Sequence, residues 1–350
     1  MIIDCHNHVL AGGLLPGHGL FRSEMTLHHR EGSALDSDGE AVGTDEDTLG
    51  GPTDPDKLIA DHRAVGIALS TVLAVAPSDY TKYGQRGTVD TGRVTGVDGP
   101  LSIDLANDYM AALVRRYPDD LVGMAAVNPR YKGVEAAREE LRRAIEDLGL
   151  RGLKLYPMYD HYSPDDPELA LPVFERAVEL DIPVMVHMGS TPVRDAPLRM
   201  GWPVLLDEVA RTFPDLRLLV CHTGFPWVDE CLVMVGRHEN LYLDVSHFNS
   251  LLDQRATYDF LVRAKQLGCS LSKVCFGTDY PGFDPPGPLL ARFALVNDVS
   301  SGQKTVPRNL MAGMLGGNWA RFAGIDWNED ETLDEIDDWE PRWRQIMDPQ

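Results

Sequence analysis

The chain has 350 residues, of which 43% are hydrophobic and 25% are charged, a composition typical of a folded globular protein. Its formal net charge of -22 argues against nucleic acid as a partner, because phosphate binding requires a positive surface. No run approaches the roughly 18 apolar residues of a membrane span. No basic segment precedes an apolar stretch at the N-terminus, so we expect neither a membrane anchor nor a secretory signal.

The five cysteines are an odd number and form no CxxC motif. Cys5, Cys221 and Cys275 lie inside or beside apolar runs, where a reduced, buried thiol is the usual state. We therefore expect a cytoplasmic protein.

Eight short apolar runs recur along the chain. Each is nearly continuous in apolar residues, as expected for parallel strands that are covered on both faces. The runs lie at 2–9, 67–75, 121–129, 150–157, 182–189, 216–224, 241–248 and 274–281. We expect a β-strand in each run.

Amphipathic helical patterns separate these runs, and several of them end at Gly or Pro, as helices commonly do. The clearest patterns lie at 54–66, 102–118, 133–149, 166–181 and 202–215. Strands that alternate with helices imply right-handed βαβ units. Eight such units predict an α/β protein with a closed (β/α)₈ TIM barrel. A doubly wound open sheet is the alternative, but no GxGxxG motif follows the first run.

We expect residues 1–324 to form this barrel as a single domain with two long insertions, 10–52 and 76–100. Both insertions follow predicted strands at the end of a barrel where active sites are built, so we interpret them as lids or substrate-binding loops. Solvent-exposed insertions without function are the alternative.

Residues 325–350 form an acidic tail that contains Trp327, Trp339 and Trp343. Disordered segments seldom keep so many aromatic residues. We expect this tail to pack against the barrel or against a neighbouring subunit. A flexible, solvated extension is the alternative.

Polar side chains recur at the C-terminal ends of the predicted strands. His6 and His8 end the first run, and alternate residues of a strand point to the same side. His187, His222 and Asp279 end the fifth, sixth and eighth runs. A barrel brings these ends together at one mouth, where burying so many polar groups without partners is costly. The set therefore predicts a bound metal ion.

Imidazole nitrogen and carboxylate oxygen suit Zn²⁺ and related divalent ions, and the absence of cysteine ligands argues against a closed structural zinc site. We expect one metal ion, with zinc favoured and manganese as the alternative, bound by His6, His8, His187 and Asp279. Such an ion lowers the pKa of bound water towards about 7. Asp279, or His222 beside the site, would accept the proton.

These motifs resemble those of the amidohydrolase superfamily, in the branch that contains the aminocarboxymuconate-semialdehyde decarboxylase-like enzymes. The matching segments are DCHNH, GLKLYP, PVMVHMG, FPDLRLLVCHTGFPW, NLYLDVS and FGTDYP, which follow the family order over residues 1 to about 324. The resemblance implies a metal-dependent (β/α)₈ enzyme with the four metal ligands named above and with His222 as the catalytic histidine.

The same resemblance bears on Lys154 and on the assembly. Other branches of the superfamily carry a carbamylated lysine on the fourth strand that bridges two metal ions. In this branch, a lysine in the context GLKLYP is usually not a ligand, which implies a structural or substrate-contacting role for Lys154, with the bridging role as the alternative. Members of the family are often dimers, so we expect a homodimer.

Two reactions fit such a site. We favour hydrolysis of an amide, lactone or related bond in a small cyclic or aromatic metabolite, because HTGFPWVDE resembles the hydrolases of the branch more than its decarboxylases. Non-oxidative decarboxylation of an aromatic or muconate-type acid is the alternative, and an inactive ligand-binding barrel is a minor one. Candidate substrate contacts, each with a surface or packing role as the alternative, are Arg194, Arg199, His161, Lys154, Trp227 and His247.

Overall fold

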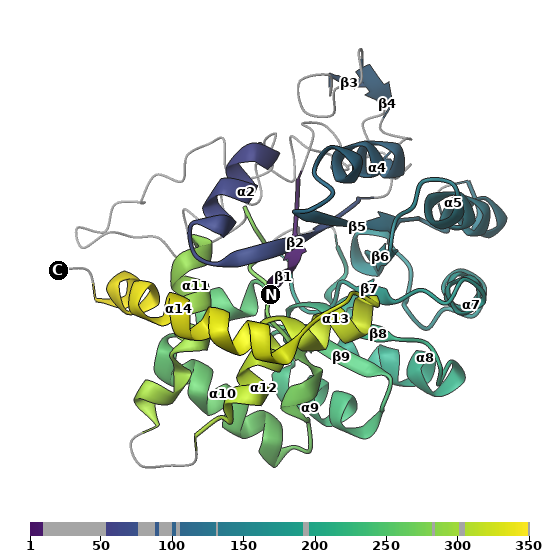
Figure 1. Cartoon of the computed structure of the whole chain (residues 1–350). Helices are drawn as coiled ribbons and strands as arrows, with labels where there is room; N and C mark the ends of the chain where they lie inside the picture. Colours follow the sequence, from purple (N-terminus) through teal and green to yellow (C-terminus); the bar gives the residue numbers. More distant parts are fainter. Residues whose placement is uncertain are drawn as a thin grey trace, which may run out of the picture.

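A computed structural model describes residues 1–9, 54–75, 88–90, 100–102, 106–130, 132–191, 196–281, 284–300 and 305–348. Eight parallel strands form one sheet in which neighbours in space are also neighbours in sequence (Figure 1). The strands are β1 (Ile2–Asn7), β2 (Ile67–Leu73), β5 (Leu121–Ala126), β6 (Gly152–Leu155), β7 (Val184–Val186), β8 (Leu218–Val220), β9 (Leu241–Asp244) and β10 (Val274–Cys275).

The sheet closes on itself where β1 meets the chain that follows β10. Cys5 N donates a hydrogen bond to Phe276 O at 3.0 Å, and Asp279 N donates one to His6 O at 2.9 Å. A parallel bridge between Asn7 and Tyr280 continues this contact. The predicted (β/α)₈ barrel is thereby confirmed.

Helices surround the barrel, and their apolar residues face the strands. Leu58, Leu141 and Phe174, from three different helices, are fully buried. The main helices between the strands are α2 (Pro55–Arg63), α4 (Ala106–Arg116), α5 (Val134–Glu146), α7 (Leu171–Glu179), α8 (Leu206–Thr212), α9 (Val228–Arg237), α10 (Gln254–Gln266) and α11 (Pro286–Ala294). The chain then continues through α12 (Arg308–Ala312) and α13 (Asn318–Ala323).

Each observed strand is shorter than the apolar run that predicted it. The run at 182–189, for example, contains only the three residues of β7. The residues that follow each strand stay buried but leave the ladder, and several of them carry the polar side chains of the mouth. An apolar run in the sequence therefore predicts a strand together with the buried residues that follow it, but it does not show where the strand ends.

Most of the two predicted insertions lies outside the described residues. Within the second insertion, β3 (Thr88–Asp90) pairs antiparallel with β4 (Pro100–Ser102), which ends just beyond it. The proposed function of these segments as lids stays a prediction.

The acidic tail forms helix α14 (Glu329–Met347), which lies across the starts of β1 and β2 (Figure 1). Trp343 is fully buried, and its Nε1 donates a hydrogen bond to Val65 O at 2.9 Å. Trp327 Nε1 donates one to Met1 O at 3.2 Å. The tail thus packs on its own barrel, at the end opposite the mouth. In the described part of the chain, no helix combines the length and apolarity needed to cross a membrane.

Candidate metal centre

Three predicted ligands meet where β1 adjoins the chain after β10. His6 Nε2 lies 3.4 Å from Asp279 Oδ1, and His8 Nε2 lies 3.3 Å from the same oxygen. These three ligand atoms lie within 4.8 Å of one another. Two ligands bound at about 2.1 Å to a tetrahedral metal ion stand about 3.4 Å apart. The spacing therefore fits ligands arranged around a shared ion.

His187, after β7, stands beside this group of three rather than within it. Its Nδ1 lies 3.0 Å from His222 Nε2. Its Nε2 is buried and has no hydrogen-bond partner among the described residues. A buried imidazole nitrogen without a partner is costly unless something binds it. The donor set of His6, His8, His187 and Asp279 thus suits a divalent metal ion.

Burial keeps His6, His187 and His222 neutral. Burial lowers the pKa of His222 to about 3, and it also lowers the pKa of His6 and of His187. Burial alone would raise the pKa of the Asp279 carboxyl, but His6 and His8 hold it well below its ordinary value. Neutral imidazoles and an ionised carboxylate are the forms that bind metal ions.

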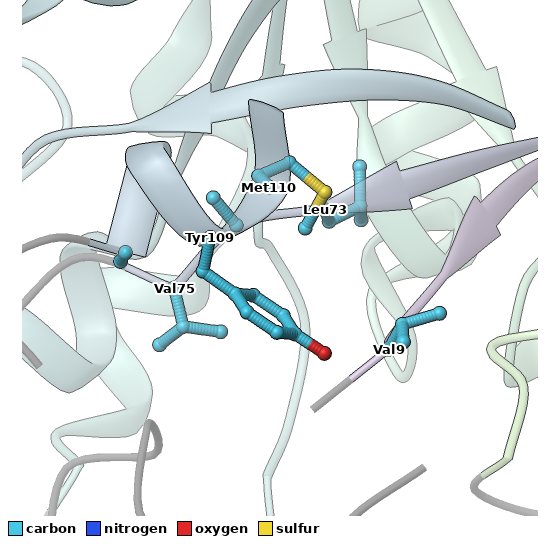
Figure 2. Close-up of a pocket in the computed structure, with 7 residues that line it drawn as sticks. Val9, Leu73, Val75, Tyr109 and Met110 are labelled. Carbon is cyan, nitrogen blue, oxygen red and sulfur yellow. The ribbon is translucent and has the colours of Figure 1, made fainter. Parts of the chain in front are cut away.

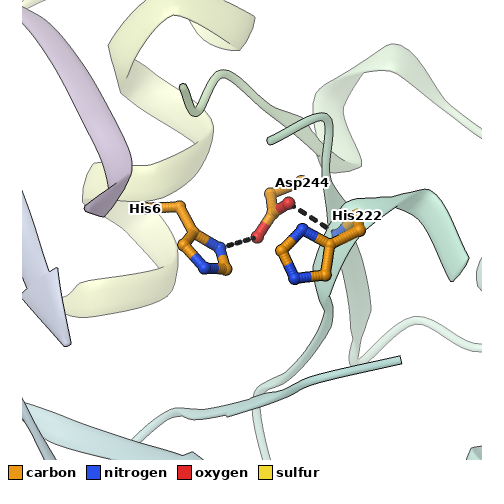
Figure 3. A group of neighbouring side chains, drawn as sticks. All are labelled: His6, His222 and Asp244. Carbon is orange, nitrogen blue, oxygen red and sulfur yellow. Dashed lines mark hydrogen bonds and ion pairs between the residues drawn. The ribbon is translucent and has the colours of Figure 1, made fainter. Parts of the chain in front are cut away.

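Asp244, the last residue of β9, is hydrogen-bonded to both His6 and His222, and the sequence pattern did not predict this role. Its Oδ2 accepts a hydrogen bond from His6 Nδ1 at 2.9 Å, and its Oδ1 accepts one from the backbone N of His222 at 2.8 Å (Figure 3). The three side chains together form a second group of potential metal ligands. Because 2.9 Å is a hydrogen-bond length, well under the spacing of two ligands on one ion, we interpret this second group as a hydrogen-bond network.

The backbone is strained at the same end of the barrel. Among the described residues, four that follow β8, β9 and β10 have φ between +52° and +64° although none is glycine: His222, Thr223, His247 and Asp279. Such conformations cost about 1–3 kcal/mol each and concentrate at functional sites. They turn the chain sharply as it leaves β8, β9 and β10.

Some of the predicted substrate contacts lie close to the histidines of the site, and others do not. The ring of His247 lies 6.2 Å from that of His222, and Lys154 is fully buried, with its Nζ 3.5 Å from His6 Nε2. His161 follows the short helix α6 (Pro157–Asp160), and Trp227 directly precedes α9. Arg199 is exposed on a short turn at Leu198–Gly201, and Arg194 lies outside the described residues.

Lys154 also contacts a thiol. Its Nζ donates a hydrogen bond to Cys221 Sγ at 2.9 Å. No ion pair to a carboxylate is found for this lysine among the described residues, and its second polar neighbour is His6. Lys154 therefore lies inside the barrel, next to the predicted ligand His6.

A small apolar pocket adjoins the site at Val9, the residue after His8. Figure 2 shows Tyr109 of α4 with its hydroxyl directed towards Val9. That hydroxyl is buried and has no partner in the described part of the chain. Leu73, Ala74, Val75, Ala106 and Met110 complete the lining. The pocket would present apolar surface and one phenol hydroxyl to a group that enters it.

The sequence matches the amidohydrolase family over residues 3–325. The chain therefore belongs to this family, and it is an enzyme of the amidohydrolase superfamily. Proteins of the family depend on metal ions, in agreement with the donor set described above. The predicted resemblance is confirmed.

A curated relative is the 2-amino-3-carboxymuconate-6-semialdehyde decarboxylase of Dictyostelium discoideum, with 27% identity over 260 residues, which cover 65% of this chain and 68% of the relative. An uncharacterised TIM-barrel protein from Bordetella bronchiseptica matches in structure with a TM-score of 0.63 and 21% identity, over 92% of this chain and 98% of that one.

A second solved structure, the 5-carboxyvanillate decarboxylase of Novosphingobium aromaticivorans with bound manganese, matches with a TM-score of 0.59 and 15% identity. The match covers 93% of this chain and 97% of that one. At such identities, both structural matches show the shared fold.

Proposed function

We propose that this chain is a metal-dependent decarboxylase that removes CO₂ from a small aromatic or muconate-type carboxylic acid. The observation that carries the proposal is the meeting of His6, His8 and Asp279 beside the neutral His222. The curated relative, itself a decarboxylase, supports this reaction.

In this proposal the ligands are His6, His8, His187 and Asp279, and the ion is zinc, with manganese as the alternative. When bound, the ion supplies Lewis-acid chemistry at a carboxylate or carbonyl oxygen of the substrate. Arg199 and Arg194 are the proposed contacts for the substrate carboxylate, because the guanidinium fork matches that group. The further proposed contacts are Lys154, His161, Trp227 and His247.

His222 handles the proton. Loss of CO₂ breaks a carbon–carbon bond and leaves its electron pair on the substrate carbon, so that R–COO⁻ and one H⁺ give R–H and CO₂. His222 Nε2 would deliver this proton. Burial lowers the pKa of His222 to about 3, so Nε2 is unprotonated at rest and would take the proton from solvent water before it passes the proton to the substrate carbon.

Hydrolysis of a cyclic amide or lactone is the second candidate, which the sequence analysis favoured. The family description and the segment HTGFPWVDE, which begins at His222, support it. Here His222 Nε2 would take a proton from water and pass it to the leaving group, with Asp279 as the alternative acceptor.

The two reactions separate in one experiment. Purified protein loaded with zinc or with manganese is incubated with aromatic and muconate-type acids, and separately with lactones and cyclic amides. Release of CO₂, with solvent deuterium incorporated at the carbon that loses it, is the expected result. Hydrolysis of the neutral substrates without CO₂ release would contradict the proposal and favour the second candidate.

Two variants make this experiment specific. H222N should lose turnover, and asparagine tolerates the positive φ of this position. H238N is the matched control, because His238 binds Asp207 at 2.7 Å on the outside of the barrel. It should keep full turnover.

A further inference from the structure

We propose that Asp244 and Ser246 are positioning residues that fix the tautomers of His6, His222 and His187, so that each Nε2 is left unprotonated. The inference rests on the proposed function, because it assigns His6 and His187 to the metal and His222 to the proton. Asp244 and Ser246 belong to β9 and the turn after it, and both are completely buried.

Asp244 orients His6 directly. Its Oδ2 is an acceptor only, so the hydrogen in the 2.9 Å contact must lie on His6 Nδ1. In the neutral imidazole, His6 Nε2 is then unprotonated, on the side of Asp279. Asp244 Oδ1 also accepts hydrogen bonds from His222 N at 2.8 Å and from Ser246 Oγ at 2.6 Å, which agrees with an ionised acceptor.

Ser246 extends the same control to His222. Its Oγ donates a hydrogen bond to Asp244 Oδ1 at 2.6 Å, which leaves Oγ free to accept one from His222 Nδ1 at 2.9 Å. The backbone O of Ser246, also only an acceptor, lies 3.2 Å from the same nitrogen. His222 therefore carries its hydrogen on Nδ1, and its Nε2 is unprotonated.

His187 completes the chain of contacts. Since His222 Nε2 is an acceptor, the 3.0 Å contact places a hydrogen on His187 Nδ1. The remaining nitrogen, His187 Nε2, is the buried atom without a partner in the described residues. The Asp244 carboxylate thus determines the tautomers of three imidazoles, directly or through Ser246. Hydrogen-bond acceptors that contact metal-binding histidines generally fix their tautomers in this way.

The isosteric variant D244N tests this assignment, because the contacts at the Oδ1 position fix the orientation of the asparagine amide and thereby the group that faces His6. The Oδ1 position accepts from His222 N, Ser246 N and Ser246 Oγ, so the amide oxygen of asparagine must occupy it. The NH₂ group then faces His6 Nδ1 and forces the hydrogen onto Nε2. We expect zinc affinity to fall about 10–100-fold.

S246A and T223V separate this role from general packing. At His6, S246A keeps the 2.9 Å bond to Asp244 and removes only the 3.0 Å contact of Ser246 Oγ with His6 Nδ1. Zinc affinity should therefore stay within about threefold of wild type, while kcat/KM falls about 10-fold or more because His222 loses its support. T223V removes a buried hydrogen bond of 2.9 Å to Asp244 O, on the backbone rather than on the carboxylate. Its zinc affinity should match that of wild type.

The readouts are zinc affinity, by competition with a chelator, and the tautomers of His6 and His222, by nitrogen NMR of labelled histidine in the metal-free protein. We expect Nδ1–H for both residues in wild type and Nε2–H for His6 in D244N. Wild-type zinc affinity in D244N, or an unchanged His6 tautomer, would overturn the inference. If the tautomers behave as expected but no wild-type turnover is found, the proposed function fails and the assignment of Asp244 stands.

Discussion

Asp279 combines a functional side chain with a strained backbone, since its carboxylate meets two histidines while its φ is +64°. Replacement by asparagine keeps the shape and tolerates that φ, but it removes the negative charge that a divalent ion requires. We expect D279N to fold and to lose most of its bound metal. Elemental mass spectrometry of the wild type and the variant measures this.

The outcome that contradicts this prediction is an equal metal content in both proteins. D207N is the matched control. Asp207 is also bonded to a histidine, but it lies on the outside of the barrel, so its variant should retain metal.

His247 has the most unusual backbone at the mouth, with φ 57° and ψ −55°. Only glycine adopts this region freely, so we expect H247G to release strain of about 1–3 kcal/mol, less about 0.5–1 kcal/mol for the added freedom of the unfolded chain. The free energy of unfolding in urea should rise by about 1 kcal/mol, while kcat/KM should fall if the ring contacts substrate as proposed.

H247A separates the two effects, because alanine removes the imidazole but keeps the strain. It should lose kcat/KM like H247G without gaining stability. A decrease in the stability of H247G relative to H247A would show that this backbone is not strained.

The sequence predicted the mouth residues that follow strands, because a polar residue after an apolar run stands out. It did not predict Asp244, which lies inside the run at 241–248 and reads there as one polar residue within a strand. Its partners His6 and His222 are 238 and 22 residues away, and no local pattern connects them. A residue such as Asp244, which supports the site through hydrogen bonds to distant residues, can be identified only from the folded barrel.

At the scale of the elements, all eight strands and the five clearest helical patterns were predictable, because burial on both faces and 3.6-residue periodicity leave strong patterns. The exact ends were not, since buried loops continue the apolar runs. The sequence also did not predict where α14 packs. Its acidic residues indicate solvent, and the burial of Thr332, Ile336 and Trp343 shows which side faces the barrel.

Trp343 should carry much of the docking of α14. W343F replaces the buried indole with a smaller apolar ring, and the carbonyl of Val65 loses its donor, which alone costs about 1–3 kcal/mol. We expect a lower free energy of unfolding in urea, with kcat/KM and metal content unchanged, because α14 lies opposite the mouth.

V233A is the control for this substitution, since Val233 of α9 is 50% exposed and its replacement should change stability by no more than about 0.5 kcal/mol. If W343F were as stable as V233A, the hydrogen bond to Val65 would contribute nothing. If W343F lost metal, the helix would be coupled to the site.

At the scale of the whole molecule, we keep the prediction of a homodimer. Two large apolar residues, Leu198 and Trp202, are exposed on the segment after β7. Tryptophan is enriched in the centres of protein interfaces. Light scattering at micromolar concentration should give twice the mass of the chain, and W202D should shift the protein towards monomer.

V178D provides the comparison, because Val178 is 39% exposed on α7, a helix of the outer ring. It should leave the mass unchanged. A wild-type protein of single-chain mass would contradict the dimer, and an unaffected dimer in W202D would place the interface elsewhere.

The five cysteines are free and buried, and Cys5, Cys221 and Cys275 lie within the barrel itself. A thiol reagent can therefore reach those three sulfurs only when the barrel opens, and the labelling rate in native buffer becomes a measure of that opening. A ligand that binds only the closed form suppresses opening and so slows the labelling. The labelling rate can therefore measure the binding of a metal ion or substrate even when the reaction is not known.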